Sequence, residues 1–157
     1  MKRYAAILLL LLAGCGQDAN TNTGIKDSTV VISLDTIPET RKTVKTDAVS
    51  AYSEKILDEL NDWKFAVSLH ETKRTFHYLV QMVAKEARIT DSVNIPNFGI
   101  VPKPEVHKGK EPLTCIIGFL DKKGAFKEYR KVSFQNDRLH ISTINNYVVS
   151  SYKTATP

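Results

Sequence analysis

The chain lacks the sequence motifs by which many enzymes are recognised. Its 157 residues contain no glycine-rich phosphate loop, no Gly-x-Ser-x-Gly elbow and no His-Glu-x-x-His pair. Aspartate and glutamate are scattered, and no spacing motif places two carboxylates together. These absences favour a protein that is not an enzyme, and nothing in the sequence requires a cofactor.

Cysteine is equally scarce, with only Cys15 and Cys115 in the chain. Cys115 lies within the segment Leu113-Thr114-Cys115-Ile116-Ile117, an apolar setting that favours burial as a small hydrophobic residue. A catalytic thiol needs a lowered pKa beside basic groups. We therefore expect Cys115 to be an unreactive core residue.

No apolar run is long enough to cross a membrane. The longest spans residues 4–13, whereas a bilayer-spanning helix needs about 20 apolar residues. It follows Lys2 and Arg3 and ends in small residues, which is the layout of an export signal. The residues that close it, Leu12-Ala13-Gly14-Cys15, resemble the lipobox of bacterial lipoprotein signal peptides. That resemblance implies cleavage before Cys15 and lipid attachment to its sulfur, so we expect Cys15 to anchor the protein to a membrane.

The residues after Cys15 bear on which membrane this is. In the lipoprotein class, an Asp at the next position usually retains the protein in the inner membrane, and here that position is Gly16. The resemblance therefore implies the outer membrane, with the domain facing the periplasm. Gln17-Asp18 is similar to the surface-export signal of some Bacteroidota lipoproteins, so exposure on the cell surface stays open as an alternative.

Charge is only mildly unbalanced. The net charge is +5, and removal of Lys2 and Arg3 with the leader lowers it by two, which does not indicate a nucleic-acid-binding protein. Short basic clusters could face anionic lipid or an acidic partner, but we interpret them as ordinary solubility and protection of strand edges. The clusters are Arg41 with Lys42 and Lys45, Lys73-Arg74, Lys122-Lys123, and Lys127 with Arg130 and Lys131.

The mature chain predicts an α+β fold in one domain. Asp47 is a suitable N-cap for a helix over 47–61, whose apolar residues fall on one helical stripe. We expect this N-terminal helix to pack on an antiparallel sheet of about five strands, with a proline-rich loop. The expected divisions are a signal peptide at 1–14, a lipidated cysteine, tether and short strand at 15–46, the domain at 47–152 and a frayed tail at 153–157.

Residues 64–83 predict a β-hairpin. Large apolar residues alternate with polar ones on both sides of a polar turn at 72–75. Pairing Leu69 with Tyr78 places six large residues on one face and sets His70 opposite His77 on the other. A metal site needs three or four ligands, and the spacing offers no third, so we expect no metal site there. Trp63, just before this hairpin, is expected to be a core residue rather than a sugar-stacking platform.

Residues 113–144 predict a three-stranded meander. Its first strand, over 113–120, is apolar on both faces, and turns are expected at 121–124 and 135–137. Before it, residues 88–112 hold four prolines and still carry apolar side chains, which predicts a long loop packed on the domain or on a partner. The residues of that loop expected to bind a partner are Pro96, Phe98, Ile100, Val101 and Pro102.

Small size, a membrane tether and an apolar loop favour a non-enzymatic accessory or structural component of an envelope assembly, bound to the membrane and to other envelope proteins. Small lipoproteins that accompany type VI secretion machines, especially in Bacteroidota, are similar in size, lipobox and β-rich pattern. One alternative is a lipoprotein that binds peptide, glycan or lipid in a concave pocket near Trp63 and residues 95–101. Another is an inhibitor or immunity lipoprotein that blocks an envelope hydrolase with residues 96–112.

Overall fold

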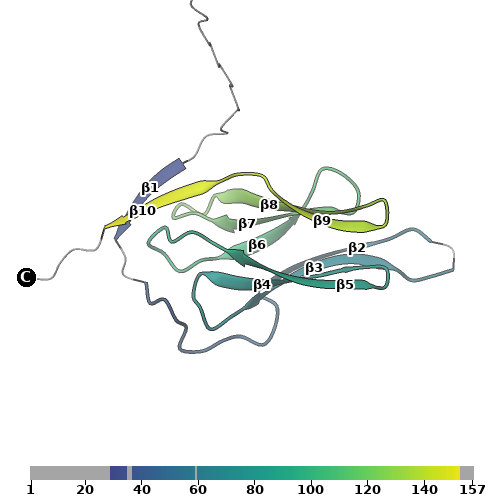
Figure 1. Cartoon of the computed structure of the whole chain (residues 1–157), viewed down its shortest axis with the longest axis horizontal. Coiled ribbons are helices and arrows are strands. Elements are labelled where there is room, and N and C mark those ends of the chain that lie inside the picture. The colour runs from purple at the N-terminus through teal and green to yellow at the C-terminus, as the bar shows by residue number, and fades with distance from the viewer. Residues whose placement is uncertain (1–28, 35–36, 59, 153–157) are drawn as a thin grey trace, which may run out of the picture.

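The computed structural model describes residues 29–34, 37–58 and 60–152, and these form two stacked antiparallel sheets and a short ribbon (Figure 1). The first sheet has the order β2-β3-β4-β5, with β2 at Ser50–Lys55, β3 at Lys64–Glu71, β4 at His77–Ala84 and β5 at Ala87–Asn94. The second has the order β6-β7-β8-β9, with β6 at Pro104–Lys108, β7 at Thr114–Leu120, β8 at Phe126–Gln135 and β9 at Arg138–Thr143. The ribbon pairs β1 at Thr29–Leu34 in parallel with β10 at Tyr147–Tyr152.

The fold is therefore all-β, and the predicted α+β class is wrong. No helix occurs in the described ranges, and so none that could span a bilayer. The predicted helix over 47–61 is instead β2 and the loop that follows it. The apolar stripe was misleading because its last two members, Leu57 and Leu60, are 93% and 94% exposed.

Residues Ser50–Lys55 form a strand because β3 supplies a hydrogen-bonding partner that local propensity cannot reveal. Ser50, Tyr52 and Glu54 are half-buried and alternate with exposed residues, which is the period of a strand rather than a helix. The amide of Ile56 donates to the carbonyl of Trp63 at 2.9 Å and closes the β2–β3 hairpin. Asp58 accepts from the amides of Leu60 and Asn61, which turns the chain where a helix was expected.

The predicted hairpin at 64–83 exists as β3 and β4, but its register differs by two residues. Leu69 pairs with Val80 rather than with Tyr78, and His70 pairs with Leu79. A shift of two residues keeps every side chain on its face. The six large residues therefore still form the core side of the sheet and are at most 2% exposed: Phe65, Val67, Leu69, Tyr78, Val80 and Met82.

The predicted meander is confirmed by β7, β8 and β9. Its inner face packs against the first sheet through Cys115, Ile117, Phe119, Val132 and Phe134, all buried. Both predicted turns are present, and Asn136 and Asp137 have the positive φ values of a two-residue hairpin turn.

The predicted loop over 88–112 is only partly a loop. Residues 87–94 form β5 on the edge of the first sheet, and residues 104–108 form β6 on the edge of the second. Prolines did not prevent these strands, because Pro104 begins one at a sheet edge, where a missing amide is tolerated. The segment 95–103 between them crosses from one sheet to the other.

The segment before β2 is fastened to the turn between β3 and β4 by Arg41. Its guanidinium donates to the carbonyls of Thr72 at 2.8 Å, Arg74 at 2.5 Å and Thr75, and it lies 3.6 Å from the Glu71 carboxylate. Its backbone amide also donates to the Lys73 carbonyl at 2.9 Å. The Arg41 side chain is only 9% exposed, so it is a structural residue rather than part of an open basic cluster.

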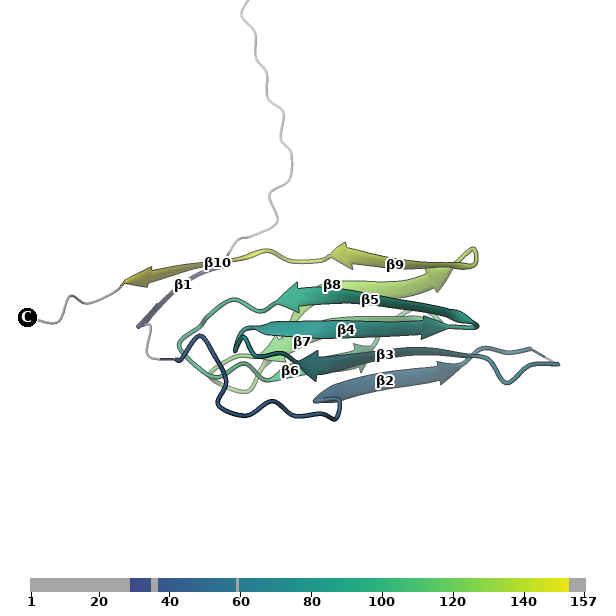
Figure 2. The same ribbon diagram turned by 60° about the horizontal axis from the view of Figure 1, so that its bottom comes forward.

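The sandwich is closed along one side and open along the other. On the closed side, β2 meets β6, where the Val106 amide donates to Ser50 Oγ at 2.9 Å and the Leu113 amide donates to Glu54 Oε2 at 3.2 Å. On the open side lie β5 and β9, each the last strand of its sheet. Figure 2 shows the strands of both sheets running along one common direction, with the β1–β10 ribbon projecting beyond one end.

Candidate partner-binding surface

The free edge of β5 is the most extended unpaired backbone in the described sheets. The Ile95 amide donates to the Phe76 carbonyl at 2.8 Å, and antiparallel pairing then alternates along the ladder. Residues Val93, Asp91 and Ile89 therefore bond to β4. The amides and carbonyls of the alternate residues point away from the sheet, and these residues are Arg88, Thr90, Ser92 and Asn94.

The outer face of the first sheet beside this edge is low in charge. One row of register partners runs Ala51, Ser68, Gln81 and Thr90 across all four strands. A neighbouring row holds His70, Leu79 and Ser92, and Leu79 is 36% exposed. A sheet face that is exposed to solvent usually carries polar and charged side chains, whereas the centres of protein interfaces are depleted of charge. The β5 edge and this face together form one continuous candidate surface.

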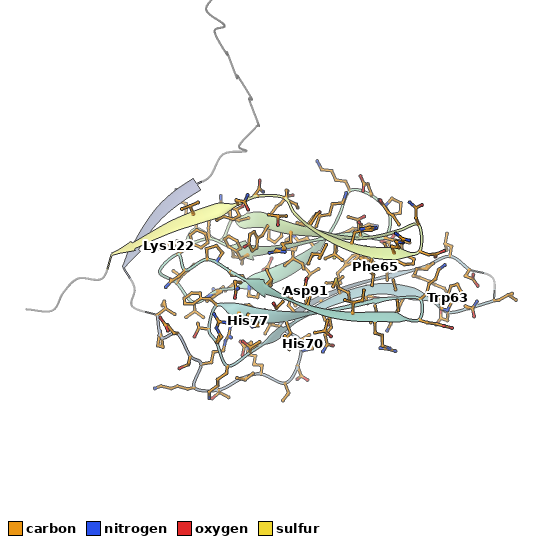
Figure 3. The ribbon with its side chains drawn as sticks, viewed as in Figure 1. Trp63, Phe65, His70, His77, Asp91 and Lys122 are labelled. Atoms are coloured by element: carbon orange, nitrogen blue, oxygen red, sulfur yellow. The ribbon has the colours of Figure 1, made fainter. Side chains whose placement is uncertain are left out.

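Asp91 lies on the edge strand and occupies one of its free amides. Its side chain lies on the core-facing row of β5, opposite Val80, but it is exposed because β5 is the last strand (Figure 3). Its carboxylate accepts from the amide of Ser92 at 2.7 Å, which is one of the four free-edge amides. Charges that point inward on edge strands protect against indiscriminate strand pairing. Asp91 thus leaves the amides of Arg88, Thr90 and Asn94 for a partner.

The predicted partner-binding segment packs largely on its own domain. Phe98 stacks on Phe119 with 5.0 Å between ring centroids and also meets the Tyr147 ring at 6.0 Å. Pro102 is buried, and its carbonyl accepts from the Tyr78 hydroxyl at 3.4 Å. Pro96 and Ile100 are half-buried, and Val101 is 58% exposed. Of the five residues, Val101 presents the largest free apolar surface.

The two histidines of the predicted hairpin do not face each other. His70 lies on β3 with Nε2 at 3.1 Å from Ser68 Oγ, and His77 begins β4 with Nδ1 at 3.1 Å from Thr72 Oγ1. Figure 3 shows them on neighbouring strands with separate surroundings. Within the described ranges, no three His, Cys, Asp or Glu side chains are grouped as metal ligands.

Cys115 is fully buried on β7, as the sequence predicted. Burial raises the pKa of its thiol from 9.0 to about 12, so the nucleophilic thiolate is suppressed at neutral pH. Cys15 lies outside the described residues.

Hollows lined by described residues lie at opposite ends of the sandwich. One, of ≈ 290 Å³, lies beside Trp63, Lys85 and Phe134, with the Lys85 ammonium 4.9 Å from the centre of the Trp63 ring. The other, of ≈ 310 Å³, is lined mainly by polar residues that include Arg74, His77 and Asn94. Neither of these two hollows joins Trp63 to residues 95–101, because these segments lie at different ends of the strands.

The sequence did not predict two features of the structure. The β5 edge was hidden inside the predicted proline-rich loop, although Ile89, Asp91 and Val93 alternate with Thr90 and Ser92 as strand residues do. The buried role of Arg41 has no local sequence signal, because its acceptors lie more than thirty positions away. Comparisons with known proteins add no relative: no family model, no curated protein and no solved structure matches this chain.

Proposed function

We propose that this protein is a non-enzymatic accessory component of a bacterial envelope assembly, tethered to the membrane by lipid on Cys15. Its β-sandwich binds a partner protein, and the partner contributes an extended segment that pairs with β5. The observation that carries this proposal is the free edge of β5, which offers unpaired amides and carbonyls at Arg88, Thr90 and Asn94.

Strand addition suits this edge for physical reasons. Main-chain hydrogen bonds to an exposed edge supply affinity, and the alternating side chains of the added strand supply specificity. An added strand would lie beside Thr90 and Ser92 and would extend the uncharged outer face of the first sheet. Ile89, which is 44% exposed on the core-facing side of β5, would be covered by the inward side chains of the added strand.

The partner must also compete with the Asp91 carboxylate for the Ser92 amide. A hydrogen bond to a charged group contributes about 1.5–3 kcal/mol net, so this competition weakens indiscriminate partners without preventing a specific one. The broader assembly is a proposal too, and a type VI secretion machine is the specific candidate that the size and lipobox favour.

A proline substitution tests the edge directly. Thr90→Pro removes an amide that faces away from β4, so the fold should tolerate it while strand addition fails. Thr143→Pro is the matched control, because Thr143 lies on the other free edge, at the end of β9. The measurement is cross-linked affinity purification from intact envelopes with mass spectrometry, using Cys15→Ala as the unanchored control.

Recovery of several envelope proteins, lost in Thr90→Pro and kept in Thr143→Pro, is the expected result. Equal recovery by both proline variants would remove β5 as the binding edge. Recovery of a single hydrolase would replace the assembly role with that of an inhibitor, and recovery of no protein would overturn the accessory function altogether.

A further inference from the structure

The antiparallel topology sorts the loops into two groups at opposite ends of the strands. The ribbon end, beside the β1–β10 ribbon, gathers the segments 37–49, 72–76, 95–103, 121–125 and 144–146. The distal end gathers 56–63, 85–86, 109–113 and 136–137. Figure 3 shows this separation through Lys122 at the ribbon end and Trp63 at the distal end.

The loop segments of the two ends differ in charge. Basic side chains exceed acidic ones by eight to three in the ribbon-end segments: Arg41, Lys42, Lys45, Lys73, Arg74, Lys103, Lys122 and Lys123 against Glu39, Asp47 and Asp121. In the described residues of the distal-end segments, acidic side chains exceed basic ones by five to two: Asp58, Asp62, Glu86, Glu111 and Asp137 against Lys85 and Lys110. Clusters that are scattered along the sequence thus converge on one surface.

Among the described residues, all the basic side chains of the ribbon end except Arg41 lack an ion-pair partner, whereas three of the five acidic side chains of the distal end are paired. Lys55 lies 2.9 Å from Asp62, Lys131 lies 2.7 Å from Glu111, and Lys85 pairs with Asp137. By contrast, seven basic side chains of the ribbon end are exposed and form no ion pair with any residue that the structure describes: Lys42, Lys45, Lys73, Arg74, Lys103, Lys122 and Lys123.

The turns that carry these charges are held by their backbones. The carbonyls of Lys73 and Arg74 accept from Arg41, while their side chains remain in solvent. In the 121–125 turn, the Asp121 carboxylate accepts from the amides of Lys123 and Ala125 and lies 3.4 Å from Lys127. The main acidic group of that turn is therefore occupied, and Lys122 and Lys123 are not neutralised by it.

We propose that the ribbon end is a docking surface for a membrane rich in anionic phospholipid. The chain enters the sandwich at this end through β1 and residues 37–49, so a surface that holds the N-terminal residues faces these charges. Thirteen residues, 16–28, separate Cys15 from β1, and at full extension they span at most about 45 Å. Attraction to anionic headgroups acts over a Debye length of about 10 Å, so a domain anchored through Cys15 can reach the distance at which its charges act.

The distribution of charge favours a lipid surface over nucleic acid. The lysines are spread over four separate loops rather than along a groove, and two of the aromatic rings near this end, Phe98 and Tyr147, contact each other against the core instead of offering a stacking platform. Each basic side chain held near an anionic surface strengthens attachment by on the order of fivefold. When the ribbon end contacts the membrane, the strands point away from the membrane surface. The free edge of β5 then runs along the side of the domain.

The docking surface depends on charges of the folded domain, whereas the tether depends on Cys15, so the two can be tested separately. The lipidated chain is reconstituted into vesicles of neutral phosphatidylcholine, with or without phosphatidylglycerol, that carry a headgroup spin label. A fluorophore is attached through Ala125→Cys at the ribbon end or Ala87→Cys at the distal end, both exposed positions. The buried Cys115 is protected from labelling.

The expected result is quenching of the residue-125 label in anionic vesicles, at least about tenfold stronger than in neutral ones, and its release in 0.5 M NaCl. The residue-87 label should not be quenched in either. Two fourfold serine variants serve as test and control. Serine at Lys73, Arg74, Lys122 and Lys123 should abolish the quenching of the residue-125 label. Serine at Lys64, Lys108, Lys110 and Arg138, which removes the same charge elsewhere, should preserve it.

Equal quenching at residue 125 in neutral and anionic vesicles, or equal loss of quenching in both serine variants, would overturn the docking surface. Failure to float with neutral vesicles would instead count against the Cys15 anchor.

Discussion

Arg41 illustrates what one side chain contributes to this domain. The sequence places it in a basic cluster with Lys42 and Lys45, yet the structure separates the three by burial. Arg41 lies under the β3–β4 turn, with its guanidinium 4.6 Å from the Tyr78 ring, while Lys42 and Lys45 extend into solvent. Several carbonyl groups thereby obtain a donor from one residue, which is how a turn with no core of its own is held.

Arg41→Ala should therefore destabilise the domain by about 2–4 kcal/mol, because unpaired buried acceptors cost about 1–3 kcal/mol each. Lys42→Ala, in the same segment but exposed, should change the free energy of unfolding by less than about 0.5 kcal/mol. Urea unfolding followed by circular dichroism measures both. Equal losses of unfolding free energy in the two variants would contradict this role of the Arg41 hydrogen bonds.

The pKa of Cys115 makes a second prediction at this scale. In the unfolded chain the thiol titrates near its usual pKa of 9.0, whereas burial keeps it protonated in the folded state up to about 12. The unfolded state therefore binds fewer protons above pH 9, and stability falls as pH rises from 9 towards 12. Below pH 9 the thiol contributes no pH dependence.

The measurement is the free energy of unfolding in urea at pH 7 to 11 for the wild-type chain and for Cys115→Ala. The wild-type should lose up to about 1.4 kcal/mol per pH unit more than the variant above pH 9. Parallel curves would show that the thiol is not held in its neutral form.

At the scale of elements, sequence patterns predicted strands where alternation was complete within one segment. The β3–β4 hairpin was recognised because its apolar residues alternate on both sides of the polar turn at 72–75. The β7–β9 meander was recognised because its first strand is apolar on both faces and its turns contain Asp, Gly or Asn. β2 and β5 were missed, because an edge strand is half-exposed and its alternation is weak. Their strand state depends on partners in β3 and β4, which no local pattern reports. For the same reason, the candidate binding edge was hidden within a predicted loop.

The bulge between β7 and β8 is an element that sequence could not reveal. The register shifts between Ile117 and Gly118, opposite Tyr129. Beside the bulge, the Glu128 carbonyl accepts from the Tyr147 hydroxyl at 2.8 Å. The Tyr129 carbonyl accepts from the Ile144 amide at 2.9 Å, which continues the β8–β9 ladder. These two bonds fasten the connection between β9 and β10 to the second sheet.

Gly118→Ala should disrupt this bulge. A Cβ there would lie 2.6 Å from a ring carbon of Phe126 and closer still to the Lys127 carbonyl. We expect a loss of about 1–3 kcal/mol from overpacking. Gly124→Ala is the comparison, because its Cβ would meet nothing within 4 Å and only its φ of +78° is unfavourable, at about 1–2 kcal/mol. Chemical shifts of Tyr129 and Tyr147 should move in the first variant and not in the second.

At the scale of the whole molecule, the ribbon is an appendage to the sandwich. β1 and β10 pair with each other and join neither four-stranded sheet. Tyr147, the first residue of β10, is the exception, because its ring packs within 5.2 Å of Phe119 and 5.9 Å of Tyr129. The boundary between appendage and core therefore falls immediately after Tyr147.

Two truncations test that boundary. A chain that stops after Tyr147 should lose less than about 1 kcal/mol of unfolding free energy, whereas one that stops after Asn146 should lose about 2–4 kcal/mol more through the missing aromatic ring. Urea titration of both chains provides the comparison. A large loss in the longer chain would mean that the ribbon is part of the cooperative core.

The parallel pairing of the ribbon also has a mechanical consequence. Thr29 pairs with Tyr147 at the start of the parallel ladder. Tension applied to the chain before β1 therefore acts on this first pair, and the hydrogen-bonded pairs open one after another. Such peeling needs little force, and it would release residues 29–37 as extra length, roughly 30 Å at full extension. The tension then acts on the hydrogen bonds between Arg41 and the β3–β4 turn before it reaches the sandwich. A chain pulled from its N-terminus would therefore lengthen by opening the ribbon, while the sandwich and its β5 edge remain folded.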